Sequence, residues 1–130
     1  MQISIIGLGR MGANMARRWA RGGVNVVAFD QSPEARASAI EANISAVASL
    51  AEAVTAQASP RVVWLMLPSG EITESTIDAL LPMLAKGDLL VDGGNANYKD
   101  TQRRAVKANA FGIEYADVGV SGGVWGLQNG

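Results

Sequence analysis

The residue pattern with the clearest chemical meaning lies near the start of the chain, where three glycines follow an apolar run. The run Gln2–Ile6 leads directly into a G-x-G-x-x-G pattern. In this pattern the first glycine permits a sharp turn from strand to helix, the second lets a pyrophosphate approach the backbone, and the third lets helix and strand pack closely. The helix that follows would direct unpaired N–H groups and its positive dipole end at phosphates. The pattern therefore predicts that a dinucleotide binds at Gly7, Leu8, Gly9, Arg10, Met11 and Gly12.

An acidic residue at the end of the next apolar run supplies the second part of this site. Asp30 follows the run 24–29 and lies close to the spacing of about 20 residues expected for the acid that binds a ribose. A carboxylate there accepts hydrogen bonds from the adenosine ribose hydroxyls and repels a 2′-phosphate. We therefore expect Asp30, Gln31 and Ser32 to contact the coenzyme and NAD to be preferred to NADP. Arg36 is near enough to pair with a 2′-phosphate, so NADP stays open as the alternative.

Composition excludes several other classes of function. The chain has 130 residues, 48% of them hydrophobic, and a net charge of −1, which disfavours nucleic acid as a partner. It contains no cysteine and no histidine, so a disulfide framework, a thiol nucleophile and an imidazole base are unavailable, and we expect no metal site. No apolar run is long enough to cross a membrane, and Met1 leads straight into the first strand. We expect a cytoplasmic protein.

Strands and helices alternate along the whole chain. Strands are expected at 2–6, 24–29, 46–47, 61–67, 88–91 and 114–118, and helices at 10–21, 33–43, 50–56, 71–85 and 98–110. This alternation predicts an α/β fold, a Rossmann-type doubly wound parallel sheet with helices on both faces, forming one dinucleotide-binding domain over 1–130. The strand at 61–67 should pair with the first strand, and Trp19 and Trp64 should be packing residues.

Three further segments of small and polar residues follow expected strands: Leu67-Pro68-Ser69, Asp92-Gly93-Gly94-Asn95 and Ser121-Gly122-Gly123. In this order and spacing the chain closely resembles the coenzyme domain of the 6-phosphogluconate dehydrogenases, within the wider β-hydroxyacid dehydrogenase family. The Gly-Leu-Gly-x-Met-Gly pattern is shared with the wider family. The Asp-Gly-Gly-Asn segment is similar to the phosphogluconate branch specifically, and it is therefore the discriminating motif.

The resemblance implies roles for these segments. Leu67, Pro68 and Ser69 would line the nicotinamide side of the coenzyme, and Asn95 would contact both coenzyme and substrate. Ser121, Gly122 and Gly123 would bind the carboxylate of a sugar acid or its neighbouring hydroxyl. From local sequence alone, Asn95 could equally cap the following helix, and Ser121 to Gly123 could form a surface turn.

The chain departs from the family pattern at two places. The NADP-using members have Asn-Arg-Thr where this chain has Asp30-Gln31-Ser32, so the arginine that pairs with the phosphate is missing. Ala96 stands where the family often has a serine, which removes one hydroxyl contact.

The activity implied by the resemblance is NAD-dependent oxidative decarboxylation of 6-phosphogluconate to ribulose 5-phosphate, in the pentose phosphate pathway. In the family the catalytic lysine belongs to an all-helical domain that also forms most of the dimer interface. The lysines present, Lys86, Lys99 and Lys107, match no catalytic position and are expected to be surface cations. We therefore expect no catalytic residue in this chain, little turnover by it alone, and a homo-oligomeric full-length protein.

Two alternatives stay open. One is a dehydrogenase for another β-hydroxy acid, such as 3-hydroxyisobutyrate. The other is a nucleotide-binding module without catalytic activity.

Overall fold

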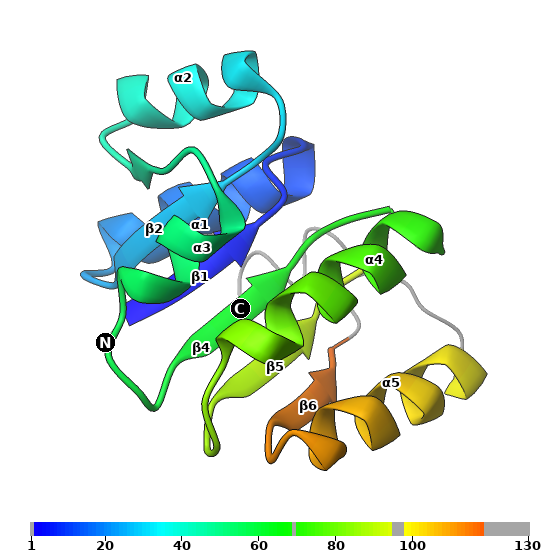
Figure 1. The fold of residues 1–130 in the computed structure, drawn as a ribbon. Helices are drawn as coiled ribbons and strands as arrows, with labels where there is room; N and C mark the ends of the chain where they lie inside the picture. The colour runs from blue at the N-terminus through cyan, green and yellow to red at the C-terminus, as the bar shows by residue number, and fades with distance from the viewer. Residues whose placement is uncertain (1, 69, 95–97, 119–130) are drawn as a thin grey trace.

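A parallel sheet of six strands forms the centre of the fold in the computed structural model, which describes residues 2–68, 70–94 and 98–118 (Figure 1). The strands are β1 (Gln2–Ile6), β2 (Asn25–Phe29), β3 (Ser45–Ala46), β4 (Val62–Leu65), β5 (Leu89–Asp92) and β6 (Glu114–Asp117). Their order across the sheet is β3-β2-β1-β4-β5-β6, so the direction of winding reverses between β1 and β4. The predicted doubly wound sheet is confirmed, as is the pairing of β4 with β1.

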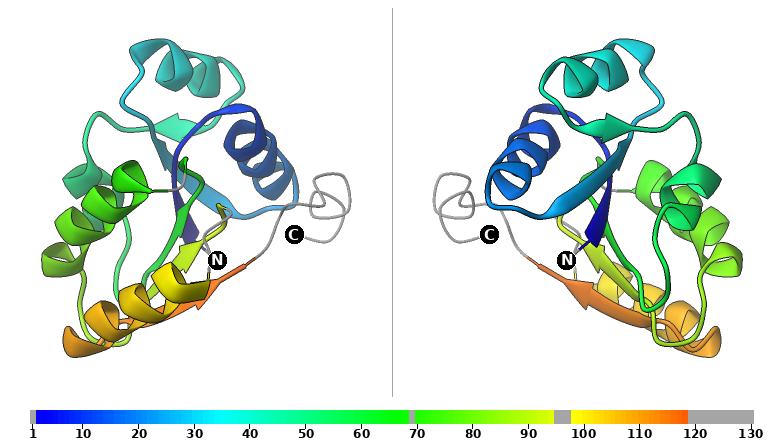
Figure 2. Two further views of the ribbon diagram at one scale, coloured as in Figure 1. Left: turned by 90° about the vertical axis from the view of Figure 1, so that its right-hand side faces the viewer. Right: turned by 90° about the vertical axis from the view of Figure 1, so that its left-hand side faces the viewer.

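Helices cover both faces of the sheet, as predicted. They are α1 (Arg10–Arg21), α2 (Pro33–Glu41), α3 (Leu50–Thr55), α4 (Glu71–Leu80) and α5 (Tyr98–Ala110), with a 3₁₀ turn, η1 (Leu81–Met83), after α4. Buried side chains of α1 and α2 join one apolar cluster, whereas those of α3, α4 and α5 join the other. Figure 2 shows α1 on the opposite side of the sheet from α4 and α5.

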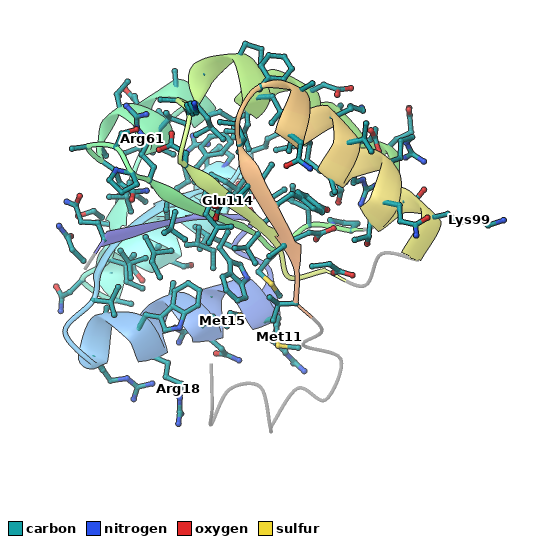
Figure 3. The ribbon with its side chains drawn as sticks, turned by 90° about the horizontal axis from the view of Figure 1, so that it is seen from below. Met11, Met15, Arg18, Arg61, Lys99 and Glu114 are labelled. Atoms are coloured by element: carbon teal, nitrogen blue, oxygen red, sulfur yellow. The ribbon has the colours of Figure 1, made fainter. Side chains whose placement is uncertain are left out.

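Helix α1 packs on the sheet through one face. Met15 is 4% exposed and points toward the sheet, whereas Arg18 points away from it (Figure 3). Trp19 meets Trp64 of β4 edge to face, with ring centroids 5.2 Å apart. Both tryptophans are packing residues, as the sequence predicts, and they hold the last turn of α1 against the sheet.

Several predicted boundaries are too generous. The helix expected at 71–85 ends at Leu80 and continues as a 3₁₀ turn, because Pro82 has no N–H to donate and its ring crowds the preceding turn. The helix expected at 33–43 ends at Glu41, and Asn43 then adopts a left-handed conformation with φ of 64°. These differences change no position at the carboxyl edge of the sheet.

Two kinds of site have no candidate within the described ranges. No helix there is long and apolar enough to cross a membrane. Across the same ranges, no group of three or more acidic, histidine or cysteine residues is placed to hold a metal ion.

Candidate functional site

The corner between β1 and α1 is built from close backbone contacts that only glycine permits. Gly7 has a φ of 107°, and a Cβ there would overlap the carbonyl oxygen of Met66. A Cβ on Gly12 would in turn overlap the carbonyl oxygen of Gly7. Gly7 therefore makes the turn and Gly12 brings the first turn of α1 against the end of the strand, as the sequence predicts.

Gly9 differs from its two neighbours because the space beside it is open. Apart from Gly9 itself and its two chain neighbours, no heavy atom of the protein lies within 4 Å of the position that a Cβ on Gly9 would take. Gly9 is also the N-cap of α1, with a φ of −64°, and it provides no side-chain cap. The first turn of α1 contains no acidic residue, so a positive helix end faces this opening. A group with negative charge fits this arrangement.

Asp30 ties the glycine corner to the end of β2. Its Oδ2 accepts a hydrogen bond of 2.7 Å from the N–H of Leu8, and its Oδ1 accepts one of 2.8 Å from the N–H of Ser32. An ionised carboxylate has about four acceptor positions. Asp30 can therefore hold the loop and still accept hydrogen bonds from a ligand.

Arg36 and Ser32 are both engaged with the backbone. The Nη1 of Arg36 donates to the carbonyl oxygens of Asp30, at 2.7 Å, and Gln31, at 3.3 Å. The hydroxyl of Ser32 accepts from the N–H of Ala35 and caps α2. Both bonds use only the Nη1 of Arg36, so they leave the Nε and Nη2 donors and the positive charge of its guanidinium in place. The Ser32 hydroxyl already has a structural role.

A cavity of about 210 Å³ opens at the carboxyl ends of β1, β2 and β4. Its lining includes five residues predicted from the sequence: Gly7, Asp30, Gln31, Leu67 and Pro68. The other lining residues, which were not predicted from the sequence, are Ile6, Phe29, Leu50, Ile72 and Thr76. Ile72 is 53% exposed at the start of α4, although no sequence motif marks it. The cavity lies at the point where the winding of the sheet reverses, which is where ligands bind in such folds.

The remaining predicted residues divide into two groups. Leu8, Gly9, Arg10, Met11, Gly12 and Ser32 form the adjoining corner rather than the cavity lining. Ser69, Asn95, Ser121, Gly122 and Gly123 lie outside the described residues.

The segment after β5 is held against the segment after β4. Asp92 is 2% exposed, and its Oδ1 accepts a hydrogen bond of 2.9 Å from the N–H of Gly94. The N–H of Gly93 donates to the carbonyl oxygen of Leu65 at 2.8 Å. A Cβ on Gly94 would lie 2.7 Å from the carbonyl oxygen of Leu67. The segments after β4 and β5, for which the family resemblance implies contacts with the nicotinamide and the substrate, are therefore in contact with each other.

Buried charged side chains lie next to the loops after β4 and β5, which we call the second pair of loops. Arg104 of α5 is 1% exposed and bridges Asp92 of β5 and Glu74 of α4. Burial raises the pKa of Asp92, and this effect outweighs the opposing effects of the Gly94 N–H and the Arg104 charge. Burial, followed by the charge of Asp92, raises the pKa of Tyr115 to about 12. Neither Arg104 nor Glu74 was predicted as a site residue.

The three lysines differ in their surroundings. Lys99 extends away from the molecule into solvent (Figure 3), and Lys86 is also exposed, as predicted. The prediction for Lys107 is incomplete, because this half-buried lysine pairs with Glu74 and, at 2.7 Å, with Asp78. Burial disfavours ionised Glu74, but hydrogen bonds from Lys107, Arg104 and Arg103 outweigh it and lower the pKa of Glu74 to about 2.

Comparison with sequence families matches residues 2–130 to the family described as the NAD binding domain of 6-phosphogluconate dehydrogenase. The chain belongs to this family. As an NAD-binding domain of this kind, it has the glycine corner, the acidic residue after β2 and the cavity at the reversal of the sheet in one place.

Individual relatives of this NAD-binding domain are dehydrogenases. The NAD(+)-dependent, decarboxylating 6-phosphogluconate dehydrogenase of Haloferax volcanii is 41% identical over 130 residues, which are 100% of this chain and 42% of that protein. Among solved structures, 3-hydroxyisobutyrate dehydrogenase of Mycobacterium tuberculosis, studied with L-serine, is 30% identical with a TM-score of 0.82. That match covers 93% of this chain and 42% of the other.

A second solved structure comes from the phosphogluconate branch. The 6-phosphogluconate dehydrogenase of Plasmodium falciparum, described with NADP+ and with 6-phosphogluconate, is 26% identical with a TM-score of 0.79. The match covers 88% of this chain and 26% of that protein. The NAD-binding domain therefore spans less than half the length of each of these relatives.

Proposed function

We propose that this chain binds the coenzyme of an NAD-dependent 6-phosphogluconate dehydrogenase. The observation that carries the proposal is the open backbone at Gly9, which lies at the start of α1 and next to a cavity lined by Asp30. The pyrophosphate would lie against Gly7 to Gly12, where N–H groups and the helix dipole favour an anion. The adenosine half would occupy the cavity, whose apolar lining from Leu50 and Ile72 suits a flat ring.

The coenzyme is NAD rather than NADP in this proposal. Asp30 presents a carboxylate where the ribose hydroxyls would lie, and a 2′-phosphate there would be repelled. The guanidinium of Arg36 is held by two backbone carbonyls and carries one positive charge, which does not balance the Asp30 carboxylate together with the nearly two negative charges of a 2′-phosphate. The Haloferax relative carries NAD(+) in its name, which supports the same choice.

The second pair of loops, after β4 and β5, would bind the nicotinamide half of the coenzyme and the substrate. Leu67, Pro68 and Ser69 would lie beside the nicotinamide, and Asn95, Ser121, Gly122 and Gly123 would bind 6-phosphogluconate. When bound, the nicotinamide ring supplies the hydride acceptor for oxidation of the sugar acid. The residues of this chain orient the coenzyme and the substrate, and we assign none of them as the catalytic base. The product of the whole enzyme would be ribulose 5-phosphate.

A second candidate is a dehydrogenase for a smaller hydroxy acid. The structural similarity to 3-hydroxyisobutyrate dehydrogenase favours it. The Asp-Gly-Gly-Asn segment favours a phosphogluconate instead. Titrating the NADH-loaded chain with 6-phosphogluconate and with 3-hydroxyisobutyrate separates the two, since the proposed function requires the first to bind more tightly.

Calorimetric titration of the chain with NAD and with NADP tests the proposal directly. We expect NAD to bind at least about tenfold more tightly, corresponding to about 1.4 kcal/mol of phosphate repulsion. Equal affinities, or tighter binding of NADP, would contradict the assignment of Asp30. Absence of binding by both would contradict the proposed function itself.

A variant at Gly9 separates binding from folding. Gly9→Ala adds a methyl group where no protein atom lies within 4 Å, at a φ that alanine adopts readily. We expect its free energy of unfolding to stay within about 0.5 kcal/mol of the wild type. NAD affinity should fall about tenfold or more, because the methyl group blocks the approach of the pyrophosphate. Unchanged affinity in a folded Gly9→Ala chain would place the phosphates elsewhere.

A further inference from the structure

A single buried arginine connects the two loops at the β4–β5 side of the site. The Nε of Arg104 donates to the Oε1 of Glu74 at 2.9 Å, and its Nη1 donates to the Oδ2 of Asp92 at 3.2 Å. Arg104 is only 1% exposed, so its contact with Asp92 is shielded from water and its contact with Glu74 is partly shielded. The guanidinium therefore fixes a residue of α4 relative to the end of β5.

The Asp92 contact reaches the loop after β5 directly. One carboxylate oxygen is held by Arg104, and the other accepts the N–H of Gly94. Because a carboxylate is planar and rigid, fixing one oxygen fixes the direction of the other. Gly94 lies against the carbonyl of Leu67, so its position also limits the loop after β4.

The Glu74 contact reaches the loop after β4 through the first turn of α4. Thr73, next to Glu74, is 1% exposed, and its hydroxyl donates to the carbonyl oxygen of Pro68 at 2.6 Å. When Arg104 holds Glu74, it holds the helix turn that carries Thr73. Both loops are thus anchored to one side chain that lies outside the cavity lining.

We propose that Arg104 is a positioning residue that sets the loops after β4 and β5 in the arrangement that receives the nicotinamide half of the coenzyme. This inference rests on the proposed function. It depends on the planar fork of arginine, since Nε and Nη1 reach the two carboxylates from two separate, fixed positions, whereas a lysine presents all its donors from a single nitrogen.

The neighbouring residue supplies a matched control. Arg103 also donates to the Oε1 of Glu74, at 2.7 Å, but its side chain is 52% exposed, and its other ion pair is with Asp100 in the same helix. The experiment therefore compares Arg104→Lys and Arg104→Met with Arg103→Lys and Arg103→Met. Both methionine variants retain an unbranched apolar stem, like that of arginine, and remove the charge.

Two ligands distinguish positioning from loss of folding. NADH and ADP-ribose share the adenosine and pyrophosphate parts, but only NADH carries the nicotinamide. We expect Arg104→Lys to weaken NADH binding about tenfold and to leave ADP-ribose binding within about twofold of the wild type. Both Arg103 variants should bind both ligands as the wild type does. A general loss of structure would weaken both ligands equally.

Each outcome has a defined meaning. If the wild-type chain binds neither ligand, the proposed function fails. If it binds both, but NADH no more tightly than ADP-ribose, the loops do not hold the nicotinamide and the inference about Arg104 is wrong. The inference is also wrong if the Arg104 and Arg103 variants lose NADH affinity equally.

A measurement on the wild type keeps the test independent of variant folding, because removing one partner from a buried ion pair can unfold a chain. Hydrogen exchange of the Gly94 amide, followed by NMR, reports whether Asp92 holds it. We expect exchange at least about tenfold slower than in an unprotected peptide, and slower still with NADH bound. Exchange at the unprotected rate would overturn the inference.

Discussion

Two regions at the carboxyl edge of the sheet are held in place by different physical means: the glycine corner with the segment after β2, and the loops after β4 and β5. Between β1 and α1, Gly7 packs against the backbone of Met66 and Gly12 packs against the backbone of Gly7, while the carboxylate of Asp30 accepts from backbone N–H groups. Between β4 and β5 the loops are tied to a network of buried or half-buried charges centred on Glu74 and Arg104. The glycine corner is therefore held by close packing of the backbone, and the loops after β4 and β5 are held by ion pairs.

This difference assigns different sensitivities to the two sides. Backbone contacts depend on the absence of side-chain atoms and do not respond to pH. Ion pairs depend on protonation, and they lose their stabilising effect when a carboxylate is neutralised. The two sides meet at the segment after β4, because Gly7 lies against the carbonyl of Met66 and Gly94 lies against that of Leu67. A change confined to one side should therefore affect the other only through this segment.

The largest effect is expected from filling the first glycine position. Gly7→Ala places a methyl group onto the carbonyl oxygen of Met66 and forces alanine to a φ of 107°. Strain and overlap together should lower the free energy of unfolding by about 4 kcal/mol. Urea denaturation measures this loss, with Gly9→Ala as the control that adds the same methyl group to open space. Equal stabilities for the two variants would show that the corner is not held by shape.

The glycine corner is the part of the site that sequence predicts best. Turn, approach and packing each require glycine at a fixed position along the chain, so the pattern carries its own geometry. The bounds predicted for β1 and α1 match the structure for the same reason. The apolar lining from Leu50 and Ile72 was not predictable, because it depends on how α3 and α4 are placed over the sheet.

The second-largest effect is expected from the charge network and depends on pH. The pKa of Glu74 is about 2 in the folded chain, against an ordinary value of 4.5, because hydrogen bonds from Lys107, Arg104 and Arg103 outweigh its burial. Since the folded-state pKa is lowered, the stabilisation is complete above about pH 4.5 and is lost as the pH falls toward 2. It corresponds to about 3 kcal/mol. Glu74→Gln should remove most of this stabilisation at pH 7 and converge with the wild type near pH 2.

Glu71→Gln is the matched control for this prediction, because Glu71 is an exposed residue in the first turn of the same helix. It should cost less than about 1 kcal/mol, mainly through the helix dipole. Thermal or urea unfolding between pH 2 and pH 7 measures both variants. A difference between Glu74→Gln and the wild type that does not change across this range would contradict the pKa assigned to Glu74.

The charge network could not be predicted from sequence in the way the glycine corner was. Glu74, Asp92 and Arg104 belong to three separate elements, and nothing in their spacing indicates that they meet. Charged side chains on helices are usually exposed to solvent, and for this reason Lys107 was predicted to be a surface cation without a specific partner. Only the packing of α4 and α5 on the same face of the sheet brings these residues together.

A smaller effect is expected from neutralising Asp30, whose carboxylate joins the glycine corner to the segment after β2. Asp30→Asn replaces one acceptor oxygen by an NH₂ group, so either the N–H of Leu8 or that of Ser32 loses its partner. Stability should fall by about 2 kcal/mol. Loss of the charge should also reduce the preference for NAD over NADP about tenfold in calorimetric titration. A preference unchanged in Asp30→Asn would mean that another group discriminates the coenzymes.

The smallest effect concerns the helix caps and separates a structural role from a binding role for Ser32. Ser32 caps α2 by accepting from the N–H of Ala35 at 3.2 Å, and Ser49 caps α3 by accepting from the N–H of Glu52 at 3.1 Å. Ser32→Ala and Ser49→Ala should each cost about 1 kcal/mol of stability. Because Ser32 adjoins Asp30 and Ser49 does not line the cavity, any larger loss of NAD affinity in Ser32→Ala measures its contact with the coenzyme. Equal NAD affinities in the two variants would leave Ser32 a cap alone and restrict recognition of the ribose to Asp30 and Gln31.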